Sequence, residues 1–74
     1  MSSVTIYTKA WCGYCHAAKR LLQDKGLSFE EIPVDHDQIR FEEMVSKSQR
    51  RTVPQIFIDH QHIGGYTDLV RHFS

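Results

Sequence analysis

The sequence predicts an α/β fold in which a four-stranded mixed sheet is flanked by three helices. Two observations predict this class. Runs of β-branched and aromatic residues alternate with segments of helical periodicity in the first part of the chain, which is typical of parallel strands joined by helices. Near the end, two short strand-like runs are separated by a tight turn, which indicates a hairpin. The predicted order is strand, helix, strand, helix, strand, strand, helix.

The first three elements form a strand, a helix and a strand. Residues 4–7 (VTIY) suit a buried strand. Apolar side chains then recur at helical spacing over residues 14–22, and Gly26 is placed to end that helix. A second strand is predicted over residues 29–34. Because Pro33 in this strand cannot donate a ladder hydrogen bond, the strand is expected at a sheet edge, parallel to the first.

The second half predicts a helix, a hairpin and a final helix. Asp35 followed by Gln38 is typical of a helix cap, and the helix that follows is expected to end before Arg50. Residues 55–59 (QIFID) suit a third strand, and residues 62–63 a short return strand. The two glycines after this hairpin fit unusual backbone angles. The last helix is expected to direct three apolar side chains inward: Leu69, Val70 and Phe73.

Length and charge set the class of protein. The 74 residues are expected to form one domain over positions 1–74. Nine basic and nine acidic residues cancel, so we expect neither nucleic acid nor a membrane as partner. The first residues, Met1 to Val4, lack the basic start and apolar run of a secretory signal. We therefore expect a cytoplasmic protein, in which a purely structural disulfide would be unusual.

Both cysteines of the chain lie three positions apart, in the segment WCGYC. With Cys12 just before the first helix and Cys15 on its first turn, both sulfurs face the helix N-terminus within bridging distance. Unpaired N–H groups and the helix dipole stabilise a thiolate there, and C-x-x-C cysteines have pKa values of about 3.5 to 7.5. We expect Cys12 to be the exposed attacking thiol and Cys15 the inner, resolving thiol.

Three other interpretations of the cysteine pair are open. In the first interpretation, the cysteines are simply apolar core residues, although Gly13 and Tyr14 between them argue against burial. A zinc site needs about four ligands, and the five histidines offer no second spaced pair. The segment 12–16 also matches the C-x-x-C-H attachment sequence for c-type haem, with Met44 as an axial ligand. The missing export signal and the strand-rich surroundings argue against haem.

Four blocks of residues carry a resemblance to a known family. They are Tyr7-Thr8-Lys9, then Cys12, Tyr14 and Cys15, then Thr52-Val53-Pro54, and Gly64-Gly65-Tyr66-Thr67-Asp68. With these blocks in this order, nearly the whole chain resembles a glutaredoxin of the small dithiol type, which has the thioredoxin fold. The resemblance implies a glutathione-dependent thiol–disulfide oxidoreductase that reduces protein disulfides and glutathione mixed disulfides through Cys12 and Cys15.

The resemblance also implies where glutathione, as co-substrate, would bind. The bond between Val53 and Pro54 would be cis, and the Val53 main chain would face Cys12 and pair with the peptide as an added strand. The expected glutathione-binding residues are Thr67 and Asp68 at the γ-glutamyl end, Lys9, Tyr14 and one of Arg50 or Arg51 at the glycyl end, and Thr52, Val53, Pro54 and Gly65 in the same groove.

The sequence departs from the family at two places. Gly13 stands where the family most often has proline, and family members usually continue past the position of Ser74. Family motifs without that proline sometimes share an iron–sulfur cluster, so one alternative is a dimeric carrier or assembly protein with a 2Fe–2S cluster on Cys12 and glutathione. A second alternative is a thioredoxin-like reductant served by a flavin reductase, because Trp11-Cys12-Gly13 is reminiscent of thioredoxins. Without a cluster, we expect a monomer.

Overall fold

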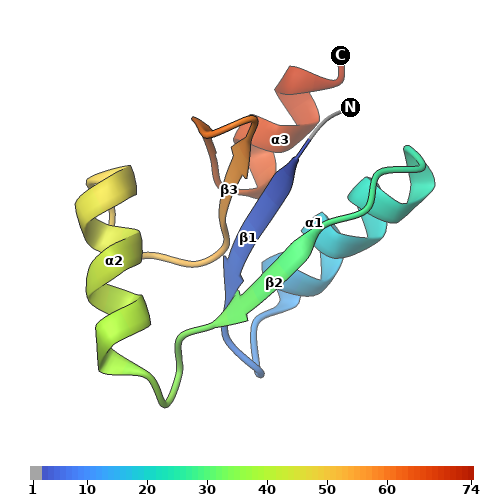
Figure 1. The fold of residues 1–74 in the computed structure, drawn as a ribbon. Helices are drawn as coiled ribbons and strands as arrows, with labels where there is room; N and C mark the ends of the chain where they lie inside the picture. The colour runs from blue at the N-terminus through green and yellow to red at the C-terminus, as the bar shows by residue number, and fades with distance from the viewer. Residues whose placement is uncertain (1–2) are drawn as a thin grey trace.

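Figure 1 shows the fold in a computed structural model that describes residues 3–74. The elements are β1 (Val4–Thr8), α1 (Gly13–Asp24), β2 (Glu30–Pro33), α2 (Gln38–Ser48), β3 (Gln55–Ile58), β4 (Gln61–Gly64) and α3 (Tyr66–His72). Their order and the α/β class are as the sequence predicts. The part of the signal-sequence expectation that concerns Met1 and Ser2 lies outside the described residues.

The four strands form one mixed sheet in the order β2-β1-β3-β4. β1 runs parallel to β2 and antiparallel to β3, and β3 runs antiparallel to β4. The strand that contains Pro33 is therefore an edge strand, as predicted. In Figure 1, α1 and α3 lie on one face of the sheet and α2 on the other, which is the thioredoxin fold.

The two faces of the sheet carry two separate apolar clusters because successive side chains of β1 point to opposite faces. Ile6 packs with residues of α1 and α3, whereas Tyr7 packs with Met44 of α2. The Tyr7 ring meets the Phe57 ring edge to face, with the ring centroids 5.8 Å apart. Because β1 is buried on both faces, it holds the segment that follows it, which leads to the cysteines, in a fixed place.

Helix ends agree with the sequence at α1 and differ at α2. Gly26 has a φ of +73° just after α1, as expected for a residue that ends a helix. At α2, the cap is Asp37, whose side chain accepts from the Arg40 N–H at 3.0 Å. The prediction of Asp35 was wrong because the helix begins at Gln38, which places Asp35 too far upstream. Asp35 instead accepts from the Ala10 N–H at 3.1 Å, and this bond lowers the pKa of its carboxyl.

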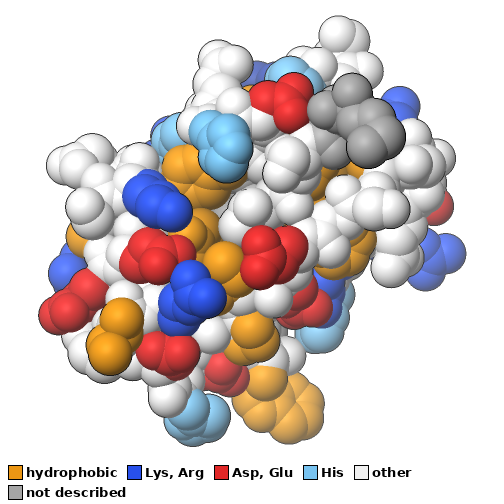
Figure 2. All heavy atoms as spheres, in the orientation of Figure 1, with side chains coloured by type: hydrophobic (Ala, Val, Ile, Leu, Met, Phe, Trp, Pro, Cys, Tyr) orange, Lys and Arg blue, Asp and Glu red, His pale blue; other side chains and the backbone are white. Residues whose placement is uncertain are grey.

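The last helix also differs in one side chain. Leu69 is fully buried and Phe73 is half-buried against the same cluster, as predicted. Val70 is 40% exposed. Leu69 and Phe73 are four positions apart and therefore share the inward face of this short helix, whereas Val70 is one position after Leu69 and points away from that face. On the face in Figure 2, acidic and basic side chains are interspersed. Within residues 3–74, no helix is long and apolar enough to cross a membrane.

Candidate active site

The two cysteines form a disulfide at the N-terminus of α1. Their Cα atoms are 5.2 Å apart, and Cys12 is the N-cap residue of the helix. The Cys12 sulfur accepts from the Cys15 N–H at 3.1 Å. Cys12 is partly exposed, whereas Cys15 is fully buried. The pair is therefore unequal in access, and a backbone donor already points at the outer sulfur.

The other interpretations of the cysteine pair fit this geometry poorly. Cys12 is too exposed to be a core residue. Met44 lies in the apolar cluster under α2. His16 is exposed, with its ring 3.1 Å from the Ala10 carbonyl oxygen. In the described part of the chain, no group of three or more His, Cys, Asp or Glu residues is placed to hold a metal.

The loop before β3 faces the outer cysteine. The peptide bond between Val53 and Pro54 is cis, as the family resemblance implied. The Val53 carbonyl oxygen lies 3.8 Å from the Cys12 sulfur. Because a disulfide sulfur carries no proton, this approach is a contact in the oxidised protein. The loop thus places a main-chain segment next to the sulfur that a substrate can reach.

A groove of about 150 Å³ begins at this loop and runs to α3. Eight of the ten residues expected to bind glutathione line it: Tyr14, Arg50, Thr52, Val53, Pro54, Gly65, Thr67 and Asp68. Gln55 and Tyr66 also line it, and sequence reasoning missed both. The Tyr66 ring stacks on the Tyr14 ring with centroids 5.9 Å apart, so the two form one wall. The sequence did hold one signal for Gln55, because it is a polar residue between Pro54 and the apolar run of residues 56–58.

Arg50 and Asp68 are paired across this groove. The guanidinium of Arg50 donates to the Asp68 carboxylate at 3.0 Å, and the same oxygen accepts from the Gly65 N–H at 3.0 Å. The Gly65 bond, followed by the Arg50 bond, lowers the pKa of Asp68. Gly65 is the N-cap of α3, so Thr67 lies inside the helix and is not its cap. Asp68 is therefore a fixed carboxylate at one end of the groove.

Lys9 and Arg51 lie outside the groove, and both are placed over the ring of Phe41. The Lys9 ammonium is 5.4 Å and the Arg51 guanidinium carbon 5.1 Å from the centre of the Phe41 ring. Both cations are attracted to the face of the aromatic ring. The structure thus separates the two arginines, which the sequence could not do: Arg50 pairs with Asp68, and Arg51 lies over the Phe41 ring, as Lys9 does.

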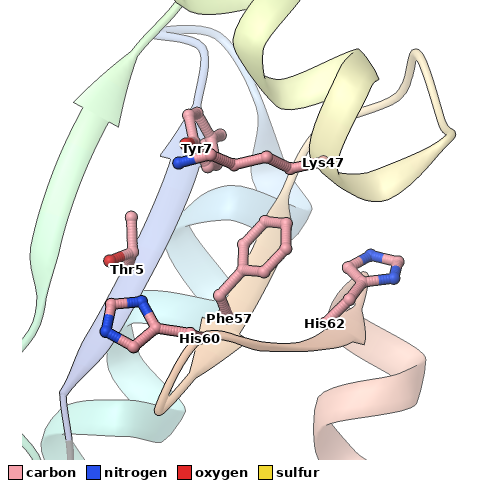
Figure 3. A pocket seen from close by; sticks show the side chains of 6 residues that line it. All are labelled: Thr5, Tyr7, Lys47, Phe57, His60 and His62. Carbon is pink, nitrogen blue, oxygen red and sulfur yellow. The ribbon is translucent and has the colours of Figure 1, made fainter.

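A larger groove of about 390 Å³ lies beside α2 (Figure 3). Its lining residues come from β1, α2 and the hairpin of β3 and β4: Thr5, Tyr7, Lys47, Phe57, His60 and His62. The Tyr7 hydroxyl, which is buried, donates to Glu43 at 2.6 Å, and burial together with this carboxylate raises the pKa of Tyr7. No cysteine lines this groove, so we place the candidate active site at the smaller one.

Substitution of Gly64 by alanine is expected to lower the free energy of unfolding by about 2 kcal/mol or more. Gly64 has a φ of +123°, and a Cβ there would lie 2.7 Å from the Asp68 Cγ. The carboxylate would have to move away from Gly65 and Arg50. Denaturant unfolding measures the effect, with Gly13→Ala as the matched control.

A Cβ at Gly13 meets nothing within 4 Å, so Gly13→Ala is expected to leave stability unchanged or raise it by less than about 1 kcal/mol. Equal stabilities of the two variants would contradict the close approach of Asp68 to Gly64. Gly13 is also the first residue of α1, where proline is well tolerated.

Comparison with known proteins adds to this geometry. The profile of the Glutaredoxin family matches residues 4–63. Glutaredoxin 3 of Escherichia coli (strain K12) is 59% identical over 69 residues, which cover 93% of this chain and 83% of that protein. The structure of glutaredoxin 1 from Francisella tularensis, complexed with cacodylate, superposes with a TM-score of 0.83 at 38% identity. The superposition covers 99% of this chain and 93% of the Francisella chain. A buckwheat glutaredoxin–glutathione complex superposes with a TM-score of 0.87 at 27% identity, over 97% of this chain and 68% of the buckwheat chain.

Proposed function

We propose, from the premise that this chain belongs to the glutaredoxin family of thiol–disulfide oxidoreductases, that it is a glutathione-dependent enzyme. Its substrates would be protein disulfides and mixed disulfides of proteins with glutathione. The observation that carries the proposal is the position of the partly exposed Cys12 sulfur, 3.8 Å from the Val53 carbonyl oxygen at one end of a groove. A related buckwheat glutaredoxin forms a complex with glutathione, which supports this choice of co-substrate.

The proposed cycle begins with the reduced protein. The Cys12 thiolate attacks the glutathione sulfur of a mixed disulfide, the substrate thiolate leaves, and glutathione stays on Cys12. The Cys15 N–H, 3.1 Å from the Cys12 sulfur in the oxidised protein, stabilises the thiolate before attack. A second glutathione thiolate then attacks the sulfur of the bound glutathione, which forms oxidised glutathione and releases the Cys12 thiolate. On protein disulfides, Cys15 instead displaces the substrate and closes the disulfide that the structure contains.

Charge complementarity supports one orientation of glutathione along the groove. Its γ-glutamyl end carries both an amine and a carboxylate, which match Asp68 and Arg50 at the α3 end. The glycyl carboxylate would lie toward Lys9, Tyr14 and Arg51, because Lys9 and Arg51 share the Phe41 ring. Between these ends, the Val53 main chain would pair with the cysteinyl part.

The two alternatives have less support. A shared 2Fe–2S cluster would need the Cys12 thiolate of the reduced protein, two glutathione thiolates and a second subunit, so one chain supplies only one of its protein ligands. We therefore propose no step through a cluster. A thioredoxin-like role would not need the charged end of the groove, where Arg50 pairs with Asp68. The cycle needs a reducing glutathione pool, so we propose that the protein acts in the cytoplasm. Because each step uses the cysteines of one chain, we propose that it acts as a monomer.

The identity of the reductant tests the proposed function. Glutaredoxin dithiols have potentials of about −200 to −230 mV, which allows exchange with the glutathione pool. We expect steady turnover of a glutathionylated peptide with glutathione, glutathione reductase and NADPH, and none with thioredoxin reductase and NADPH. Turnover supported by thioredoxin reductase alone would favour the thioredoxin-like alternative and contradict the proposal.

A further inference from the structure

We infer that Gln55 and His62 are positioning residues of the glutathione groove, which hold Thr52 so that its hydroxyl group donates a hydrogen bond to the ligand. The inference rests on the proposed function, because it concerns the same groove. Within residues 3–74, neither residue has a hydrogen bond to a cysteine. Both act through a chain of hydrogen bonds that runs from the hairpin of β3 and β4 to the loop beside Cys12.

The chain of hydrogen bonds centres on Gln55, which is only 1% exposed. Its Nε2 lies 3.0 Å from the Thr52 carbonyl oxygen and 3.3 Å from the Thr52 Oγ1. Its Oε1 lies 2.8 Å from the His62 Nε2. Because a carbonyl oxygen only accepts, the amide nitrogen must face Thr52 and the amide oxygen must face His62. The direction of every bond follows, and the His62 Nε2 is the donor.

His62 is suited to this role by its surroundings. It is half-buried on β4, and its ring lies 5.1 Å from the Phe57 ring between centroids, at the larger groove in Figure 3. Burial and the positive charge of Arg50 lower the pKa of His62, against a smaller opposing effect of Asp68. The neutral ring carries its proton on Nε2, and the charged ring carries a proton there as well. The donor is therefore present in either state.

The consequence for the groove concerns the Thr52 side chain. Its Oγ1 accepts from Gln55, so the hydroxyl hydrogen is directed to another acceptor, and Thr52 lines the groove. The same Gln55 amide holds the Thr52 carbonyl, directly before the Val53 segment that lies against Cys12. Loss of the His62 donor would leave a buried Gln55 oxygen without a partner and release this restraint.

Substitutions at His62 test the inference in the reduced, full-length protein. For a glutathionylated peptide, His62→Leu is expected to raise KM about tenfold with kcat little changed, because a binding restraint is lost and the chemistry at Cys12 is not. His62→Gln, whose amide can donate, should restore most of the affinity. The control is His60→Asn, on the same hairpin and at the larger groove but without a bond to Gln55 among the described residues. It should match wild type, because asparagine tolerates the positive φ of this position.

A second pair of measurements does not depend on glutathione. We expect the NMR signals of the Gln55 side-chain amide and the Thr52 backbone amide to shift in His62→Leu and to stay in place in His60→Asn. We also expect Gln55→Met to raise KM as His62→Leu does, with no further rise in the double variant. Unmoved signals, an unchanged KM or additive effects would each overturn the inference. Failure of the proposed function would look different, since wild type itself would show no glutathione-dependent turnover.

Discussion

Replacement of Cys12 by serine is expected to abolish turnover of both substrate classes, by at least about 10³-fold. A serine hydroxyl is not ionised near neutral pH, so the Cys15 N–H at the helix N-terminus has no thiolate to stabilise. Serine is also a good N-cap residue, and the fold should therefore be kept. Steady-state kinetics measures the loss, with thermal unfolding as the control for folding. A folded variant with turnover close to wild type would contradict the assignment of Cys12.

Replacement of Cys15 by serine is expected to separate the two activities. Turnover of glutathionylated peptides should stay within about threefold of wild type, because a second glutathione can release Cys12. Reduction of protein disulfides should fall by at least about a hundredfold, because no thiol within the protein can displace the bound substrate. The buried position of Cys15 supports this division, since a substrate can reach only Cys12.

Parallel assays of the two substrates with the Cys15→Ser protein measure this separation. Wild type serves as the reference for both, and thermal unfolding shows whether the variant folds. Equal loss of both activities in a folded variant would contradict a resolving role for Cys15. Retained reduction of protein disulfides would contradict it as well.

Local patterns in the sequence were enough to predict the order of the helices and strands, and the resemblance to glutaredoxins implied the thioredoxin fold. Apolar periodicity placed the helices, and β-branched runs placed the strands within a few residues. Pro33 alone indicated the edge strand, because its missing N–H has a consequence that does not depend on distant residues. The same holds for Gly26, whose positive φ follows from its place after a helix. The spacing of Cys12 and Cys15 was likewise a local signal, and the structure joins them.

The parts that the sequence did not predict depend on contacts between distant segments. Arg50 meets Asp68, 18 positions away, and Asp35 meets Ala10, 25 positions away. The cap of α2 was a local signal, because Asp37 directly precedes Gln38 and accepts from the Arg40 N–H three positions on. The partner of Arg50 is not visible in local spacing, so the choice between the two arginines could not be made. Gln55 was missed for the same reason, because its role comes from a hairpin that brings His62 beside it.

The most direct test of the account is the covalent intermediate itself. The reduced Cys15→Ser protein is mixed with a glutathionylated peptide, without free glutathione, and its intact mass and peptide map are measured. We predict one glutathione per protein, bound at Cys12, and release of the peptide as a free thiol. A protein that carries the peptide in place of glutathione, or no adduct on a variant that still turns over, would contradict the account.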